Sequence, residues 1–132
     1  MAPPGLPALF VNLDSRPDRR IRMEQHLAEH GVLAERLRAT TPADLPDELL
    51  VRAADRLSPG ELACTASYLA AWRLVRARSL PHALVLEDDC VLAPRGLRRN
   101  LDHLGRALGA FERADIVSAR HRRIPFAGDV LA

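Results

Sequence analysis

Three consecutive acids, Glu87, Asp88 and Asp89, directly follow an apolar run at residues 83–86. Adjacent carboxylates repel one another unless a cation lies between them. A hard divalent ion such as Mg²⁺ or Mn²⁺ binds through oxygen ligands and keeps open positions for phosphate. In open α/β sheets ligands bind at the carboxyl ends of the strands, so this run is a candidate site for a metal and for nucleotide phosphates. On spacing alone, a solvated acidic turn is an equally open interpretation.

A second pattern could bind a metal. His26, Glu29 and His30 match H-x-x-E-H, in which two histidines on a helix bind Zn²⁺ and the glutamate acts as a base. That chemistry needs a third protein ligand from another helix, whereas this helix is expected to stop at Gly31. Histidines near a helix C-terminus also complement the negative end of its dipole. We therefore set the zinc interpretation aside.

The elements that must position the acids begin with a short apolar run at residues 8–13, which predicts a buried strand. Ser15 is a candidate N-cap for a helix over residues 18–30, which Gly31 should end in a left-handed conformation. Residues 32–39 weakly predict a second strand. The proline-containing stretch 40–56 predicts a loop with one short helical turn at 47–54.

The clearest helix start is Ser58-Pro59-Gly60-Glu61, which combines a capping serine, a proline at the first helical position and a glutamate at the third. The helix should run over residues 59–78, and its alanine-rich body predicts cover on more than one face. After the acidic strand, residues 94–108 predict another helix and residues 114–118 another strand. Alternating strands and helices predict an α/β fold with a mostly parallel sheet.

Composition excludes several classes of protein. The chain has 132 residues, of which 48% are hydrophobic, and this suits a single domain over residues 1–132. Nineteen basic side chains nearly balance 17 acidic ones, and aromatic residues make up 4%. A charged face interleaved with stacking rings is therefore not expected, which argues against a nucleic-acid partner.

Location and redox state also follow from the sequence. No stretch has the apolar length of a membrane span, and the first residues lack the pattern of a signal peptide, so we expect a cytoplasmic protein. Cys64 and Cys90 are too few for a disulfide scaffold and lack metal-ligand spacing. We expect both to be buried free thiols.

Three groups of residues, in order, resemble glycosyltransferase family 25. That family contains bacterial lipopolysaccharide and lipooligosaccharide galactosyltransferases, with animal collagen galactosyltransferases as relatives. The resemblance covers about residues 9–118. It is carried by Val11-Asn12-Leu13-Asp14 with Pro17-Asp18-Arg19-Arg20, by Ser58-Pro59-Gly60-Glu61 followed by Cys64 and Ser67, and by Val85-Leu86-Glu87-Asp88-Asp89.

The resemblance implies a GT-A-like, Rossmann-like fold and an inverting, metal-dependent glycosyltransferase. Its donor would be a nucleotide-diphospho-sugar, a UDP-sugar in the first instance and galactose among the possible sugars. Its acceptor would be a saccharide of lipopolysaccharide or another cell-surface glycan. The cofactor would be Mn²⁺ or Mg²⁺, held by an acidic motif against the donor diphosphate.

Individual roles follow from this assignment. We expect Asp89 to bind the metal directly, with Glu87 on the same face of an extended segment and Asp88 on the other. Asp88 or Glu87 would then act through water or contact the donor ribose. Arg16 and Arg19 could hold diphosphate oxygens through forked hydrogen bonds. Two roles for Asn12 stay open, reading the nucleoside base or capping the loop. The general base is not identified.

Two features depart from the family pattern. The family usually has Ser-His where this chain has Ser67-Tyr68, and tyrosine is a poor base at neutral pH. Family members also usually continue well beyond residue 118, so we expect the usual C-terminal part to be missing. The alternative function is a non-catalytic or split-enzyme nucleotide-sugar-binding module. Such a module would work through a partner chain, or the chain would self-associate through an uncovered sheet edge.

Overall fold

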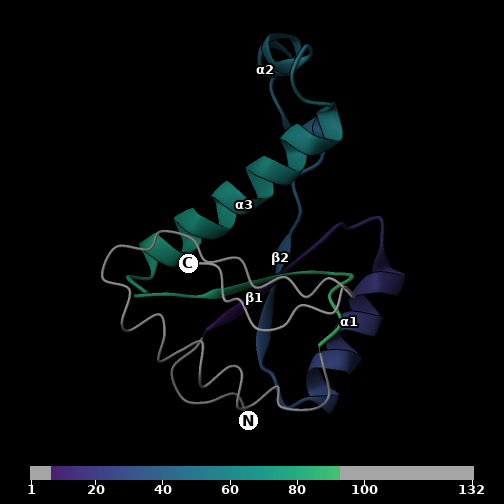
Figure 1. The fold of residues 1–132 in the computed structure, drawn as a ribbon, viewed down its shortest axis with the longest axis vertical. Coiled ribbons are helices and arrows are strands. Elements are labelled where there is room, and N and C mark those ends of the chain that lie inside the picture. The colour runs from purple at the N-terminus through teal and green to yellow at the C-terminus, as the bar shows by residue number, and fades with distance from the viewer. Residues whose placement is uncertain (1–6, 93–132) are drawn as a thin grey trace, which may run out of the picture.

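The computed structural model describes residues 7–92, which form an α/β unit with a three-stranded parallel sheet (Figure 1). Strand β1 (Ala8–Asn12) is central, with β2 (Ala34–Arg38) on one side and β3 (Leu84–Glu87) on the other. All three strands therefore end at the same edge. The predicted α/β class and parallel sheet are confirmed, and the arrangement is consistent with a Rossmann-like fold. The helix predicted at residues 94–108 and the strand at 114–118 lie outside the described residues.

Helix α1 (Pro17–Glu29) connects β1 to β2 and begins one position before the predicted start at residue 18, although its N-cap lies one position after the predicted one. Its N-cap is Arg16, and the expected cap Ser15 lies in the preceding turn. The reason is Pro17, which takes the first helical position and disfavours a helical conformation in the residue before it. At the other end the prediction is confirmed, because Gly31 has a φ of 65°.

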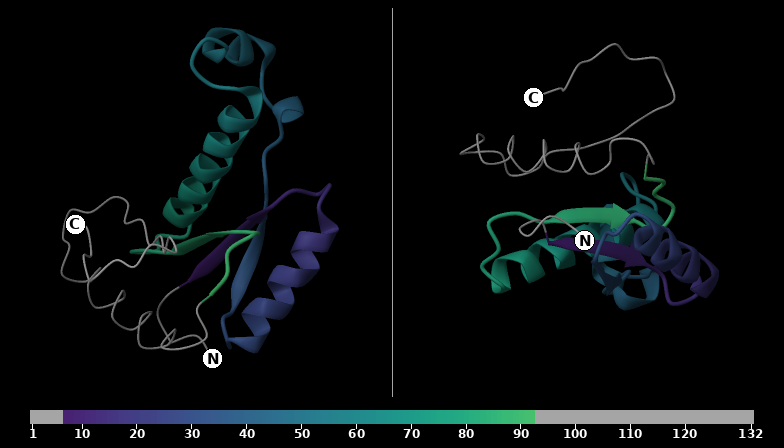
Figure 2. Two further views of the ribbon diagram at one scale, coloured as in Figure 1. Left: turned by 45° about the vertical axis from the view of Figure 1, so that its right-hand side comes forward. Right: turned by 90° about the horizontal axis from the view of Figure 1, so that it is seen from below.

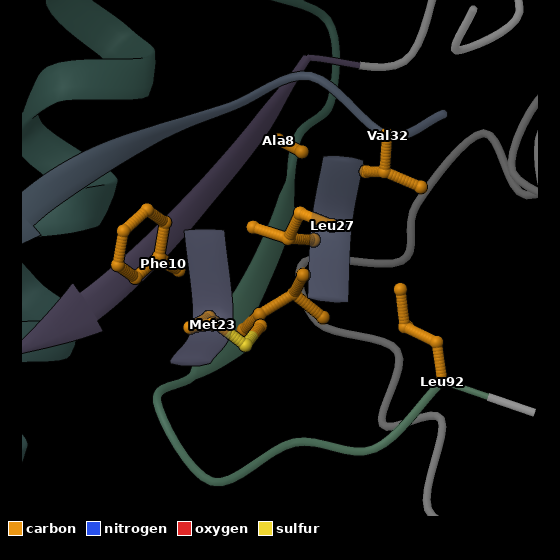
Figure 3. Packing of buried hydrophobic residues seen from close by; sticks show 7 residues of the cluster. Ala8, Phe10, Met23, Leu27, Val32 and Leu92 are labelled. Atoms are coloured by element: carbon orange, nitrogen blue, oxygen red, sulfur yellow. The ribbon is translucent and has the colours of Figure 1, made fainter. Parts of the chain in front are cut away.

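Helix α1 covers one face of the sheet with large apolar side chains. Met23 and Leu27 are buried together with Phe10 (Figure 3) and with Leu86, which pairs with Phe10 across β1 and β3. Successive residues of a strand point to opposite faces, so this cluster defines the α1 face. The remaining buried members are Ala8, Val32 and Leu92.

Helix α3 (Pro59–Ala77) connects the second strand to the third and has the predicted start. The Glu61 backbone N–H donates to Ser58 Oγ at 3.2 Å, and the Ser58 N–H donates to Glu61 Oε2 at 2.8 Å, which completes a capping box. Between β2 and α3 lie a 3-10 turn, η1 (Pro42–Asp44), and the short helix α2 (Asp47–Ala53). Figure 2 shows that α3 and α1 lie beside different parts of the sheet.

Two expectations about α3 and the cysteines were wrong for the described part of the chain. The buried residues of α3 are small, Ala63, Ser67 and Ala71, while Trp72 is 44% exposed and Cys64 is exposed. A helix that approaches a sheet through small side chains turns its larger ones outward. Neither thiol is fully buried, since Cys90 is intermediate in exposure. Partial burial raises the pKa of Cys90, and the charges of Asp89 and Glu87 add to this.

No helix within residues 7–92 combines the length and apolar character needed to cross a membrane.

Candidate functional site at the carboxyl edge of the sheet

The acidic run forms a turn and does not extend the strand. Strand β3 ends at Glu87, and the Cys90 backbone N–H donates to the Glu87 carbonyl at 3.1 Å. Asp88 and Asp89 are the two central residues of this turn. The expected extended geometry for Glu87 and Asp89 is therefore wrong, because the chain reverses after Glu87. A turn separates carboxylates that would repel one another along a straight strand.

Asp88 connects three of the segments that the sequence singled out. Its Oδ2 accepts a hydrogen bond from Asn12 Nδ2 at 2.8 Å, and its Oδ1 lies 3.2 Å from Arg19 Nη1. The Asp88 side chain is 12% exposed and that of Arg19 is 36% exposed. The end of β1, the first turn of α1 and the turn after β3 thus meet at one carboxylate. Because this carboxylate is partly shielded from water, solvent screens its pairing with Arg19 less than it screens an exposed pair.

Asn12 is the buried centre of this arrangement, with 1% of its surface exposed. Besides Asp88, its Nδ2 donates to the Arg16 carbonyl at 3.1 Å, and its Oδ1 accepts from Arg36 Nε at 3.0 Å. The amide therefore uses both N–H groups and its oxygen within the chain. Of the two roles left open for Asn12, the observed contacts are those of a residue that ties the loop after β1 to its neighbours. Its contact with a nucleotide remains a prediction.

Arg16 lies beside this cluster but is paired elsewhere. Its Nε and Nη2 donate to the two carboxylate oxygens of Asp18 at 2.9 and 2.7 Å. This fork holds the pKa of Asp18 well below its usual range. The pair is exposed, with 41% and 52% of the two side chains accessible, so solvent screens it and Arg16 can exchange partners at little cost.

Arg36 belongs to the site, although the sequence reasoning missed it. From β2 it donates to the side chain of Asn12, to the Asn12 carbonyl at 3.2 Å and to Asp14. Arg38, at the end of the same strand, also pairs with Asp14 at 2.7 Å. Hydrogen bonds from these two arginines lower the pKa of Asp14. The sequence signal that could have identified Arg36 is its place with Arg38 in the short strand β2. This strand pairs with β1, which ends at Asn12.

Glu87 and Asp89 are the exposed carboxylates of the acidic turn. They offer oxygen ligands at the edge where parallel strands end, which is the donor set that Mn²⁺ and Mg²⁺ prefer. Asp88, by contrast, already has two hydrogen-bonded partners. Glu87 and Asp89 have the ligand chemistry for a divalent ion, and a metal bound by them remains a prediction.

The three residues of the H-x-x-E-H pattern lie close together in the structure. In the described part of the chain, His26, Glu29 and His30 are the one group of three or more potential ligands whose atoms lie within 4.8 Å of one another. However, His26 Nε2 accepts a hydrogen bond from the Leu92 backbone N–H at 2.8 Å. His30 Nδ1 lies 2.8 Å from the His26 carbonyl. The Nε2 lone pair of His26, which a metal would need, thus already accepts a hydrogen bond from the backbone of Leu92.

The fold and the site define a class of protein: an α/β protein with acids and arginines gathered where its parallel strands end. A profile of glycosyltransferase family 25, described as an LPS biosynthesis protein family, matches residues 6–123. The chain therefore belongs to glycosyltransferase family 25. It is 31% identical over 98 residues to a glycosyltransferase 25 family member of Drosophila melanogaster.

That match covers 64% of this chain and 16% of the Drosophila protein, so the chain spans a small part of this relative's length. The family resemblance drawn from the motifs is confirmed. Glycosyl transfer is the activity for which the family is named.

Proposed function

We propose that the chain binds a nucleotide-diphospho-sugar at the carboxyl edge of its sheet and transfers the sugar to a saccharide acceptor. A UDP-sugar, with UDP-galactose first, is the donor to test, and a lipopolysaccharide or other cell-surface glycan is the class of acceptor. The observation that supports this best is the convergence of Asn12, Arg19 and Asp88, which come from two of the three family motifs. This convergence and family membership support the proposal of one donor site.

In this proposal Asp89 and Glu87 hold Mn²⁺ or Mg²⁺. When bound, such an ion offsets the negative charge that develops on a diphosphate leaving group. Asp88 contributes indirectly, because its two oxygens already bind Asn12 and Arg19. Its task is to keep the acidic turn close to the first turn of α1.

Arg19 and Arg16 are the proposed diphosphate ligands of the chain. Both lie where α1 begins, so the positive end of the helix dipole adds to their charge. Arg19 makes a single contact to Asp88, which leaves other guanidinium N–H groups for phosphate oxygens. Arg16 would exchange Asp18 for the ligand.

The metal-dependent donor site is tested by calorimetric titration of UDP in Mn²⁺ and in EDTA. We expect binding to be much weaker in EDTA, and Asp89→Asn to remove the metal-dependent part because a neutral amide is a poorer ligand for a hard cation. Asp55→Asn, at an exposed acid outside the site, is the matched control and should bind as wild type does. Equal UDP affinity in Mn²⁺ and EDTA would refute the metal site.

Arg19→Lys tests the diphosphate role separately. Lysine keeps the charge and can still pair with Asp88, but it loses the fork, so UDP affinity should fall while the melting temperature stays near that of wild type. Arg22→Lys, exposed on the same helix, serves as the control. A lower melting temperature with unchanged affinity would make Arg19 a structural residue.

Transfer itself is tested by following UDP release from UDP-galactose with an oligosaccharide acceptor present. Steady turnover supports an enzyme. Metal-dependent UDP binding without turnover supports the alternative, a nucleotide-sugar-binding module that needs a partner chain.

A further inference from the structure

Tyr68 reaches the end of β3 from the middle of α3. Its hydroxyl donates to Glu87 Oε1 at 2.7 Å. The tyrosine is 37% exposed and Glu87 is also exposed, so this contact lies at the surface of the carboxyl edge. A hydrogen bond from a neutral hydroxyl to a carboxylate is short and relatively strong. The contact thus restricts the rotation of the exposed Glu87 side chain.

The two neighbouring acids are held from opposite faces of the sheet. Val11 pairs with Glu87, and both lie on the face opposite to the Phe10–Leu86 pair that α1 covers. Glu87 accordingly contacts α3 through Tyr68, whereas Asp88, the next residue, contacts Arg19 of α1. Each helical layer therefore supplies one donor to the acidic turn.

The small buried residues of α3 explain how a surface tyrosine can make this contact. Ala71 is fully buried and Ser67 is 2% exposed, so α3 lies close against the chain around the sheet. Ser67 Oγ accepts from the Thr40 N–H at 2.9 Å, which ties this turn of the helix to the segment after β2. Tyr68 follows Ser67 directly, and its position is therefore set by a buried neighbour.

We propose that Tyr68 is a positioning residue for the donor site, holding one oxygen of Glu87 so that the carboxylate is presented to a divalent cation in a single orientation. This inference rests on the proposed function, because it assigns Glu87 to the metal. Tyr68 donates to Oε1, so Oε2 would be the oxygen available to the ion. Because Tyr68 already orders the Glu87 side chain, less conformational entropy is lost when the metal binds.

The test is a double-mutant cycle on UDP binding, measured by calorimetry in Mn²⁺ and in EDTA. Tyr68→Phe removes only the hydroxyl. Glu87→Gln removes the negative charge of the carboxylate that accepts from this hydroxyl. We expect Tyr68→Phe to weaken UDP binding in Mn²⁺ by about two- to tenfold, the range for losing one pre-ordered side chain. Binding in EDTA should not change. In the Glu87→Gln background the same substitution should have no further effect.

Trp72→Phe is the matched control, since Trp72 lies one turn further along α3 and is 44% exposed. It should leave UDP binding unchanged in both conditions. A merely structural role for Tyr68 would weaken binding in EDTA as well, or would persist in the Glu87→Gln background, and either result overturns the proposal.

The outcomes distinguish a failure of the donor site from a failure of the role of Tyr68. If wild type binds UDP more tightly in Mn²⁺ than in EDTA, and Tyr68→Phe binds UDP as tightly as wild type in both conditions, the donor site stands and the role of Tyr68 is refuted. If wild type shows no metal dependence, both are refuted.

Discussion

The two helices that flank the sheet are built differently. Helix α1 buries Met23 and Leu27, with 2% and 3% of their surfaces exposed, against Phe10. Helix α3 buries only alanines and a serine, and leaves Leu69 and Trp72 43% and 44% exposed. Large side chains fill the space on one face, whereas small ones bring backbone segments close together on the other.

This difference assigns different tasks to the two layers. Burial of apolar area is the main source of stability, so the α1 layer should contribute more of it. The α3 layer contributes geometry, because Ser67 and Tyr68 connect the helix to the segments after β2 and at the end of β3. Substitutions in the two layers should therefore differ in size and in what they disturb.

The largest effect is expected in the α1 layer. Phe10→Ala should lower the free energy of unfolding by about 3–5 kcal/mol, because it removes a fully buried ring and leaves a cavity. Leu69→Ala on the exposed side of α3 should cost less than about 1 kcal/mol. Urea unfolding followed by circular dichroism measures both. Equal losses would erase the distinction between the layers.

A smaller effect is expected at the polar contact of the α3 layer. Ser67→Ala leaves the Thr40 N–H without its acceptor and should lower the free energy of unfolding by about 1–3 kcal/mol. Thr65→Ala is the control, because the exposed Thr65 hydroxyl only donates to the Glu61 carbonyl of its own helix. Identical unfolding midpoints for the two variants would show that the Thr40 contact contributes nothing.

The smallest effect is a pH dependence at η1, next to α3. Asp44 accepts from the Thr41 N–H at 2.7 Å and pairs with Arg38, and these contacts lower its pKa from 3.8 to about 2. A carboxyl whose pKa is lower in the folded state stabilises that state above pH 3.8 and loses its contribution as the pH falls toward 2.

Asp44→Asn should therefore flatten the decline in stability between pH 4 and pH 2, the window between the unfolded and folded pKa values of this group. Thermal unfolding across that range measures the slope, with Asp55→Asn as an exposed control. The same slope in Asp44→Asn and wild type would exclude Asp44 as a contributor.

The sequence by itself determined the strands and α-helices and their order over residues 7–92, but not the 3-10 turn η1. Its strongest signals are local: the capping box of Ser58 and Glu61, the left-handed Gly31, and the apolar run that ends in acids. Each depends on neighbours within about four positions along the chain, so residue types alone specify it. The ordered motifs were also sufficient for the family, which the profile match confirms.

The tertiary structure alone decided which of the acids is paired and by what. Asn12 and Asp88 are 76 positions apart in the sequence, and they meet because β1 lies between β2 and β3 in the sheet. The same strand order brings Arg36 to Asn12, and close packing of α3 brings Tyr68 to Glu87. Periodicity along one segment specifies which face a side chain takes, but strand order and helix packing determine which distant side chain it meets.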